Sequence, residues 1–172
     1  MSTTTPSRPT TGGVRRLADC EAMLIARALR LLTAFGVPTL RISLGLVIAG
    51  FGLLKFFPGA SPAEGLAMQT TEVLTFGLVD GRPAVLATAA IELALGLILM
   101  TGRCIKPGLV LMAGWLAGIL SPVVLFPAEM FPGGLPTLAA QYVLKDVVLA
   151  AAWLVVAAEA FGARMRFTKS PE

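Results

Sequence analysis

Five ionisable side chains lie inside stretches of sequence that are otherwise apolar, and these are the residues with which the chain could do chemistry. They are Arg41, Lys55, Glu92, Lys145 and Asp146. A charged group at the centre of a lipid bilayer costs about 2.5 to 3.5 kcal/mol on insertion scales, so it needs a partner and usually marks a functional site. Carboxylates can accept protons and ammonium groups can donate hydrogen bonds, so these are the groups that could act on a ligand if one binds beside them.

Four apolar segments must position these residues. A helix needs about 20 apolar residues to cross a hydrocarbon core of about 30 Å, and the segments 38–57, 83–100, 108–126 and 137–161 qualify. The composition agrees, because 56% of the residues are hydrophobic and only 14% are charged, against roughly 25% charged in soluble proteins. The sequence therefore predicts an all-α fold, a transmembrane four-helix bundle. It excludes a disordered chain, a disulfide scaffold and a nucleic-acid binder.

Basic residues outside these segments predict the orientation of the bundle. Basic residues lie before the first segment, between the second and third segments, and after the fourth segment. In the two remaining loops, Arg82 is the only basic residue. The basic residues before the first segment, between the second and third, and after the fourth are Arg8, Arg15, Arg16, Arg27, Arg30, Arg103, Lys106, Arg164, Arg166 and Lys169. Because basic residues are enriched on the cytoplasmic side, both termini are expected in the cytoplasm.

The rest of the chain divides into shorter segments. Residues 1–13 are rich in Ser, Thr, Pro and Gly, which predicts a disordered tail. Residues 14–35 carry apolar side chains at helical spacing with arginines between them, which predicts an amphipathic helix on the cytoplasmic membrane surface. Charged residues within that segment argue against the alternative, a secretory signal peptide. The spans then form a membrane domain at 37–161, followed by a basic tail at 162–172.

The two outer loops also have expected structure. Ser61 and Glu64 match a capping box, and the apolar pattern that follows predicts a short interfacial helix after the first span. The loop 127–136 contains aromatic, Pro and Gly residues and is expected to fold inward over the bundle.

Charged residues from three spans are expected to meet in the outer half of the bilayer. Glu92 lies nine residues after Pro83, which places it roughly 13 Å below the outer boundary. Lys145 lies eight residues after Thr137, at a depth of roughly 12 Å. Lys55 is near the outer end of its span, and its Cα–Cβ bond tilts toward the helix N-terminus, so its side chain can start inward.

Two further polar residues extend this predicted site. Gln141 lies one turn before Lys145 on the same helix face, and Ser121 brings a hydroxyl group from the third span. The predicted polar site therefore consists of Lys55, Glu92, Lys145, Asp146, Gln141 and Ser121. The alternative interpretation is that the charges pair as structural locks that fix helix register. Arg41 is close to the cytoplasmic end of its span and is interpreted as an anchor to lipid headgroups.

Small residues predict close helix packing. Gly114 and Gly118 form a GxxxG pattern, and Gly45 with Ala49 forms a similar pair in the first span. Such pairs let helix backbones approach one another, either within the bundle or across a homodimer.

The sequence also limits the possible cofactors. It contains no His and only two Cys, without a CxxC pattern, and it has no dinucleotide-binding or P-loop motif. A familiar metal or nucleotide cofactor is therefore not expected, and none is expected to be covalently bound. Electrons, if they pass, must be carried by a bound organic molecule.

The pattern from Arg41 to Gly59, followed by 91–96 and Thr101-Gly102-Arg103, is similar to the DoxX family of small bacterial four-span membrane proteins. The resemblance covers about 37–160 and is densest in the first two spans. It implies a multi-pass protein of the bacterial inner membrane that is linked to quinone redox chemistry or to membrane oxidative-stress systems. The implied role is a quinone-linked subunit with soluble or membrane redox partners. In that role the expected catalytic residues are Glu92 and Asp146, and the expected ligand-binding residues are Lys55, Lys145, Gln141 and Ser121.

Two other functions stay open at this point. The chain could be a non-catalytic scaffold that recruits soluble redox enzymes through its basic cytoplasmic helix. It could also transport a small anion bound by Lys55 and Lys145, although four short spans suit alternating access poorly without dimerisation.

Overall fold

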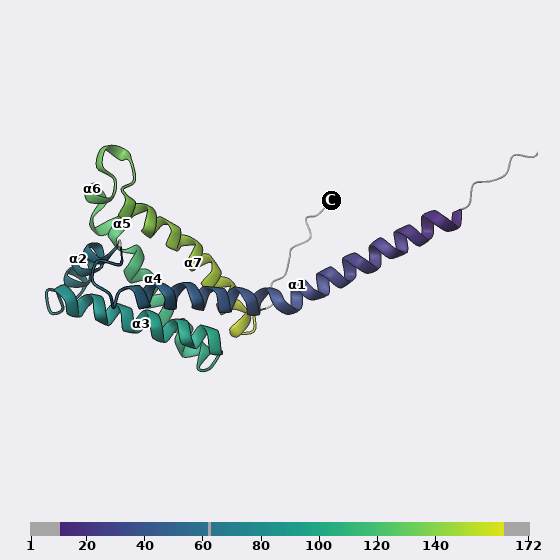
Figure 1. Ribbon diagram of the computed structural model, residues 1–172, viewed down its shortest axis with the longest axis horizontal. Coiled ribbons are helices and arrows are strands. Elements are labelled where there is room, and N and C mark those ends of the chain that lie inside the picture. Colours follow the sequence, from purple (N-terminus) through teal and green to yellow (C-terminus); the bar gives the residue numbers. More distant parts are fainter. Residues whose placement is uncertain (1–10, 62, 164–172) are drawn as a thin grey trace, which may run out of the picture. The chain divides into compact units, whose positions relative to one another are not determined.

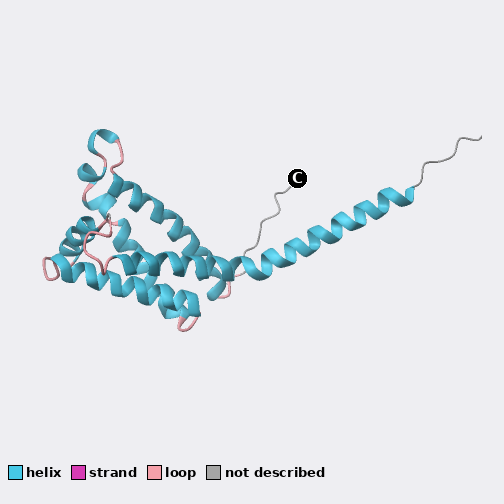
Figure 2. Ribbon diagram, viewed as in Figure 1, coloured by secondary structure: helices cyan, strands magenta, loops and turns pink. Residues whose placement is uncertain are grey.

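The computed structural model describes residues 11–61 and 63–163, with side chains from Cys20 onward, and this part of the chain is helical without strands (Figures 1 and 2). The expected basic tail lies almost entirely outside the described residues. The helices are α1 (Thr11–Leu54), α2 (Glu64–Leu74), α3 (Gly81–Thr101), α4 (Ile105–Leu120), α5 (Pro122–Leu125), α6 (Pro127–Met130) and α7 (Leu138–Ala160), with a 3₁₀ helix at Pro132–Gly134. The predicted all-α fold is confirmed.

Three helical segments in the described part of the chain are long and apolar enough to cross a membrane. They are Cys20–Leu54, Gly81–Thr101 and Ile105–Leu125. These segments are consistent with an integral membrane protein. Helix α7 has 23 residues but is not among the three segments, and its role as a fourth span stays a prediction.

Helix α1 is longer than the sequence predicts. It runs without interruption from Thr11 to Leu54 with Pro38 inside it, so the expected surface helix and first span are parts of one helix. A proline in a helix interior removes one backbone hydrogen bond, and here the helix continues through that loss. Thr11 to Gly13, expected in the disordered tail, begin α1, and the remainder of that tail lies outside the described residues.

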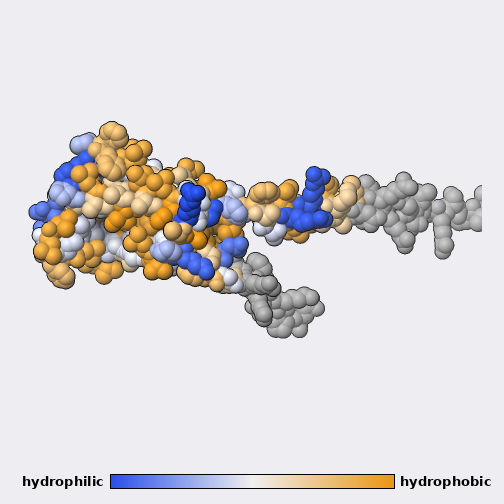
Figure 3. Space-filling model, turned by 90° about the horizontal axis from the view of Figure 1, so that it is seen from below, coloured by the Kyte–Doolittle hydropathy of each residue, from blue (hydrophilic) through white to orange (hydrophobic). Residues whose placement is uncertain are grey.

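The chain forms two compact units, Met1–Gly36 and Val37–Glu172. In the first unit, every described side chain from Cys20 to Gly36 is exposed. In the second unit, α1, α3, α4 and α7 share one apolar core. Its most buried members are Leu44, Ile48, Leu95, Leu99, Leu109, Met112, Leu116 and Val156. The outer surface of the second unit is also largely apolar on the face drawn in Figure 3, as expected for a surface that faces lipid tails.

The crossing of α1 and α3 depends on small residues. A Cβ atom placed on Gly96 would lie 2.6 Å from the Cβ of Ala49 and 2.7 Å from the carbonyl oxygen of Gly45. The close packing predicted from Gly45 and Ala49 is therefore present within the chain. A Cβ atom on Gly114 would meet nothing within 4 Å, so the second small-residue pair does not make an equivalent contact.

Proline and threonine set the ends of the later helices. The predicted third span is two helices, α4 and α5, separated at Ser121. Pro122 has no N–H group to continue the α4 pattern, and the hydroxyl of Ser121 donates to the carbonyl oxygen of Gly118 at 2.7 Å. The predicted start of the fourth segment is correct, since the Thr137 hydroxyl accepts a hydrogen bond from the amide of Ala140 at 3.2 Å.

The short helix predicted after the first span is α2, but its start differs from the prediction. The N-cap residue is Ala63, and no side chain caps the helix, so the capping box between Ser61 and Glu64 does not form. The Glu64 carboxylate instead accepts from the Gly59 amide at 2.8 Å and from the Arg82 guanidinium at 2.9 Å. This cluster joins the segment after α1 to the start of α3.

The loop before α7 packs over one end of the bundle, as predicted. Met130 at the end of α6 is 1% exposed and lies in a cluster with Ala140 and Val143 of α7. Its carbonyl oxygen accepts from the Thr137 amide at 3.0 Å. This second core closes the bundle beside α2.

Candidate functional site

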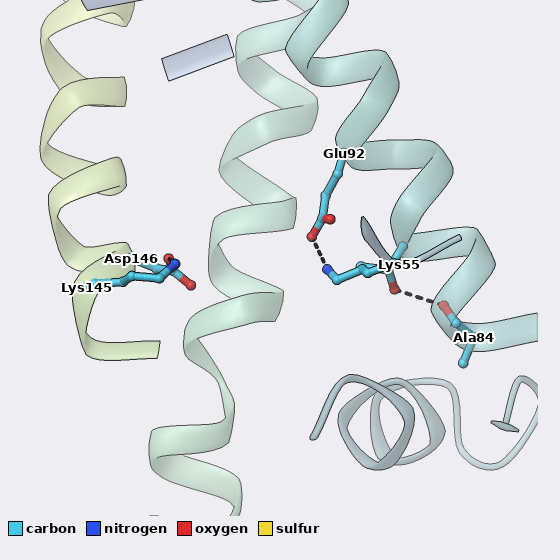
Figure 4. Close-up of polar contacts among 6 residues, drawn as sticks. Lys55, Ala84, Glu92, Lys145 and Asp146 are labelled. Atoms are coloured by element: carbon cyan, nitrogen blue, oxygen red, sulfur yellow. Dashed lines mark hydrogen bonds and ion pairs between the residues drawn. The ribbon is translucent and has the colours of Figure 1, made fainter. Parts of the chain in front are cut away.

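A cavity of about 410 Å³ lies among α1, α2, α3, α4 and α7, and two ion pairs are in its wall. Lys55, which directly follows α1, pairs with Glu92 of α3. Lys145 pairs with Asp146, its neighbour on α7, at 3.0 Å. Figure 4 shows the two pairs on opposite sides of one region of the bundle. Most of the remaining wall is apolar, so the cavity combines an apolar lining with two ion pairs.

The contact between α1 and α3 brings Lys55 to Glu92. A Cβ atom on Gly52 would lie 2.8 Å from the Cβ of Glu92, so the two helix backbones are as close as the absence of a side chain allows. Lys55 follows Gly52 by almost one helical turn and therefore extends along the same face. Its amide donates to the Gly52 carbonyl oxygen at 3.2 Å in the turn that ends the helix.

Glu92 is the most deeply buried charged residue of the site. It is 2% exposed, and the Lys55 ammonium group bonds only one of its carboxylate oxygens, Oε1. The second oxygen, Oε2, has no hydrogen-bond partner among the described residues. A buried carboxylate oxygen without a partner is energetically costly, so it marks a position where a ligand group can bind.

The second ion pair has a different environment. The Lys145 side chain is 42% exposed, whereas that of Asp146 is 15% exposed. The Lys145 ammonium group lies 4.2 Å from the ring centre of Phe51 and 5.3 Å from that of Tyr142. Two aromatic faces and one carboxylate therefore hold this ammonium group at the cavity wall.

Four of the six predicted site residues meet at the cavity, and two do not. Lys55, Glu92, Lys145 and Asp146 line it. Gln141 is exposed, and its side chain donates to the carbonyl oxygen of Pro136 at 3.4 Å. Ser121 uses its hydroxyl within its own helix end, and neither residue is among those that line the cavity. A surface position and a local backbone acceptor explain why these two side chains are not directed to the site.

Arg41 lies apart from this site, as expected. Its guanidinium group packs against Gly102, which ends α3 in the left-handed conformation with φ 72°. The cation is therefore beside the C-terminus of α3, where the helix dipole favours positive charge.

The sequence did not point to Trp115 as a site residue. Its indole lies close to Glu92 and lines the cavity, yet its Nε1 atom is buried without a hydrogen-bond partner among the described residues. Trp153 behaves as expected for a packing residue, since its Nε1 donates to the Leu109 carbonyl oxygen at 3.0 Å. Trp115 lies one helical turn from Gly118 and Ile119, which are both in the cavity wall. Residue type alone did not show that Trp115 lines the cavity and Trp153 does not.

Helix α2 supplies a further part of the wall that the sequence did not predict. Its hydroxyl-bearing residues Thr70 and Thr71 line the cavity. The Thr70 hydroxyl donates to the Leu66 carbonyl oxygen at 2.6 Å, so it is occupied within its own helix. Threonine hydroxyls can bond to their own helix in this way, which gives their sequence pattern little value for predicting a site.

Comparisons with protein-family models, curated proteins and solved structures give no match to this chain. The cavity and its charged residues are therefore the basis for a functional proposal.

Proposed function

We propose that this integral membrane chain binds the headgroup of a membrane quinone in the cavity and works as a subunit of a membrane redox or oxidative-stress complex. The observation that carries the proposal is the unpaired Oε2 atom of Glu92 in a mostly apolar cavity. The volume of about 410 Å³ lies in the usual range of about 300 to 1,000 Å³ for sites that bind small organic molecules. The sequence resemblance to DoxX proteins supports the same ligand class.

The residues of the cavity have the chemistry that such a ligand requires. A bound quinone and quinol couple supplies the exchange of two electrons and two protons. Glu92 offers a carboxylate oxygen that can take a proton from a ligand hydroxyl, and Asp146 offers a second carboxylate in the same wall. Lys145 can donate a hydrogen bond to a ligand oxygen, while Phe51 and Tyr142 provide aromatic surface beside it. The electrons pass to or from an associated redox subunit.

Quinone-analogue binding to the purified protein tests this proposal. Replacing Glu92 by Gln removes the charged acceptor while it keeps the size of the side chain. We expect Glu92→Gln to bind a hydroxyl-bearing quinol analogue at least about tenfold more weakly, since hydrogen bonds to charged groups contribute about 1.5 to 3 kcal/mol. Glu159→Gln is the matched control, because Glu159 is exposed and does not line the cavity. Equal affinity of wild type and Glu92→Gln would remove the proposed role of Glu92.

A scaffold function is the second candidate, favoured by the exposed side chains of the first unit. Arg27 and Arg30 are exposed there beside large apolar residues such as Leu29 and Leu32. Such a surface can hold a soluble enzyme at the membrane. Deletion of residues 14–34 should then abolish co-purification of the enzyme, whereas Glu92→Gln should keep it. A stoichiometric quinone in the purified protein, found by mass spectrometry of extracted lipids, would favour the redox function instead.

A further inference from the structure

Two buried polar atoms of opposite kind lack partners at the same cavity. Oε2 of Glu92 can only accept a hydrogen bond when the carboxylate is ionised, and Nε1 of Trp115 can only donate one. Each is buried without a hydrogen-bond partner among the described residues. The indole N–H faces the carboxylate, but the two atoms do not reach the distance and angle of a hydrogen bond. The site therefore offers one acceptor and one donor that a single ligand group can satisfy together.

A hydroxyl group matches this arrangement, whereas a carbonyl group matches only half of it. A hydroxyl can donate its proton to Oε2 of Glu92 while its oxygen accepts from Nε1 of Trp115. A carbonyl oxygen can accept from Trp115, but it has no proton for Glu92. The Glu92 oxygen would then stay buried and unpaired, at a cost in binding free energy.

We propose that the cavity binds the reduced, hydroxyl-bearing form of its ring ligand in preference to the oxidised, carbonyl-bearing form. This inference rests on the proposed quinone-binding function and assigns the redox form that the site selects. Glu92 discriminates between the two forms, and Trp115 bonds the ligand oxygen in both.

The surrounding charges are arranged in favour of this selection. The Lys55 ammonium group is engaged with Oε1 of the same carboxylate, so Oε2 is the oxygen left for the ligand. Lys145 is the ammonium group that could instead favour a carbonyl. Its side chain is 42% exposed and is already paired with Asp146, so its interaction with a ligand competes with water and with that carboxylate.

Binding of a matched pair of ligands to the detergent-purified full chain tests the inference. The probes are a short-tailed benzoquinol and the corresponding benzoquinone, titrated without oxygen and followed by calorimetry. We expect the quinol to bind about ten to a hundred times more tightly than the quinone, from the strength of a hydrogen bond to a charged group. A tenfold preference would raise the midpoint potential of the bound couple by about 30 mV.

Three variants assign the preference to its residues. In Glu92→Gln the new amide can donate to a carbonyl, so the ratio of the two affinities should fall to about one. Trp115→Phe keeps both charges of the Lys55–Glu92 ion pair. It should weaken the binding of both quinol and quinone, while the preference for the quinol remains. Trp153→Phe is the matched control, because the Trp153 indole already donates to Leu109 and does not line the cavity. It should bind both probes as the wild type does.

The outcomes of these measurements distinguish failure of the quinol preference from failure of the quinone-binding function. If the wild type binds quinol and quinone equally, the inference is overturned and the quinone-binding function stands. If neither probe binds, both fail. Unchanged binding of both forms by Trp115→Phe would also overturn the inference, since Trp115 and Glu92 would then satisfy each other through a small rotation in place of the ligand. The double variant Lys55→Met with Glu92→Gln repeats the binding test of Glu92→Gln without leaving the Lys55 ammonium group buried and unpaired.

Discussion

At the scale of single residues, the two ion pairs of the cavity differ in burial, and their energetic roles should differ accordingly. The side chains of Lys55 and Glu92 are 10% and 3% exposed, whereas that of Lys145 is 42% exposed. Removing one member of a buried pair leaves an uncompensated charge. Removing an exposed cation costs little, because water already screens it.

We therefore predict that Lys55→Met lowers the free energy of unfolding by about 3 to 5 kcal/mol, and Lys145→Met by less than about 1 kcal/mol. Unfolding in detergent, titrated with a denaturant, measures both values. The double variant Lys55→Met with Glu92→Gln should recover much of the loss, because no charge is then left unpaired. A Lys145→Met variant as unstable as Lys55→Met would contradict this account.

Some residue-level features were predictable from the sequence, and others were not. Lys55, Glu92 and Asp146 stood out because charges in apolar segments are rare and need partners. Trp115 did not stand out, because its role depends on an N–H group that packing leaves without a partner. Gln141 was assigned by helix spacing alone, and spacing does not reveal the nearby Pro136 carbonyl that its side chain bonds instead.

At the scale of elements, the contact between α1 and α3 sets the position of the first ion pair. Gly45 and Gly52 on α1 and Gly96 on α3 have no room for a further carbon atom. An added methyl group would push the helices apart and separate Lys55 from Glu92. The stability of this contact and the geometry of the cavity are thus coupled.

We predict that Gly96→Ala lowers the free energy of unfolding by about 1 to 3 kcal/mol, because overpacking forces neighbouring backbones to move. Gly114→Ala is the matched control on α4, where an added Cβ meets nothing within 4 Å. It should be neutral or slightly stabilising, since Ala favours a helix over Gly by about 1 kcal/mol. Denaturant titration of both variants checks the difference. If Gly114→Ala lowers the fraction of dimer measured by light scattering, the second small-residue pair serves an interface between copies of the chain.

The element boundaries show where sequence patterns are reliable. Thr137 predicted the start of α7 because an N-cap is a local interaction that its own side chain makes. The end of α4 at Leu120 was missed, although Pro122 was visible in the sequence, because hydropathy continues unchanged across the break. Pro38 had the opposite effect, since it suggested a boundary inside a helix that continues.

At the scale of the whole molecule, the distribution of basic residues predicts a topology that the two cysteines can test. Cys20 and Cys104 are both exposed, and both are expected on the cytoplasmic side. A maleimide that does not cross membranes should therefore leave intact cells unlabelled and react with both thiols after lysis.

A cysteine on the opposite side provides the control for this topology. Leu135, in the loop before α7, is 74% exposed. In a chain with Cys20→Ser and Cys104→Ser, Leu135→Cys should react in intact cells. Labelling of Cys104 before lysis would reverse the predicted orientation.

The fold class followed from composition, since a chain that is 56% hydrophobic cannot cover its surface with polar groups in water. The shared core of α1, α3, α4 and α7 follows from the same apolar excess. The cavity did not follow from composition, because it depends on where large and small side chains meet across helices that are distant in sequence. Its contribution from α2 is an example, since that helix was predicted only as an interfacial segment.

The Arg82 guanidinium bonds both the Glu64 carboxylate and the Phe56 carbonyl oxygen, at 2.9 and 2.7 Å. Arg82 is the only basic residue in the two loops expected outside, and its charge is thus balanced by the structure itself. Glu72, Asp80 and Glu129 are the other charged residues in those loops, so with the Glu64–Arg82 pair neutral the two loops carry a net charge of −3. A net negative charge disfavours the approach of an anion from that side, which argues against transport of a small anion as the function of the chain.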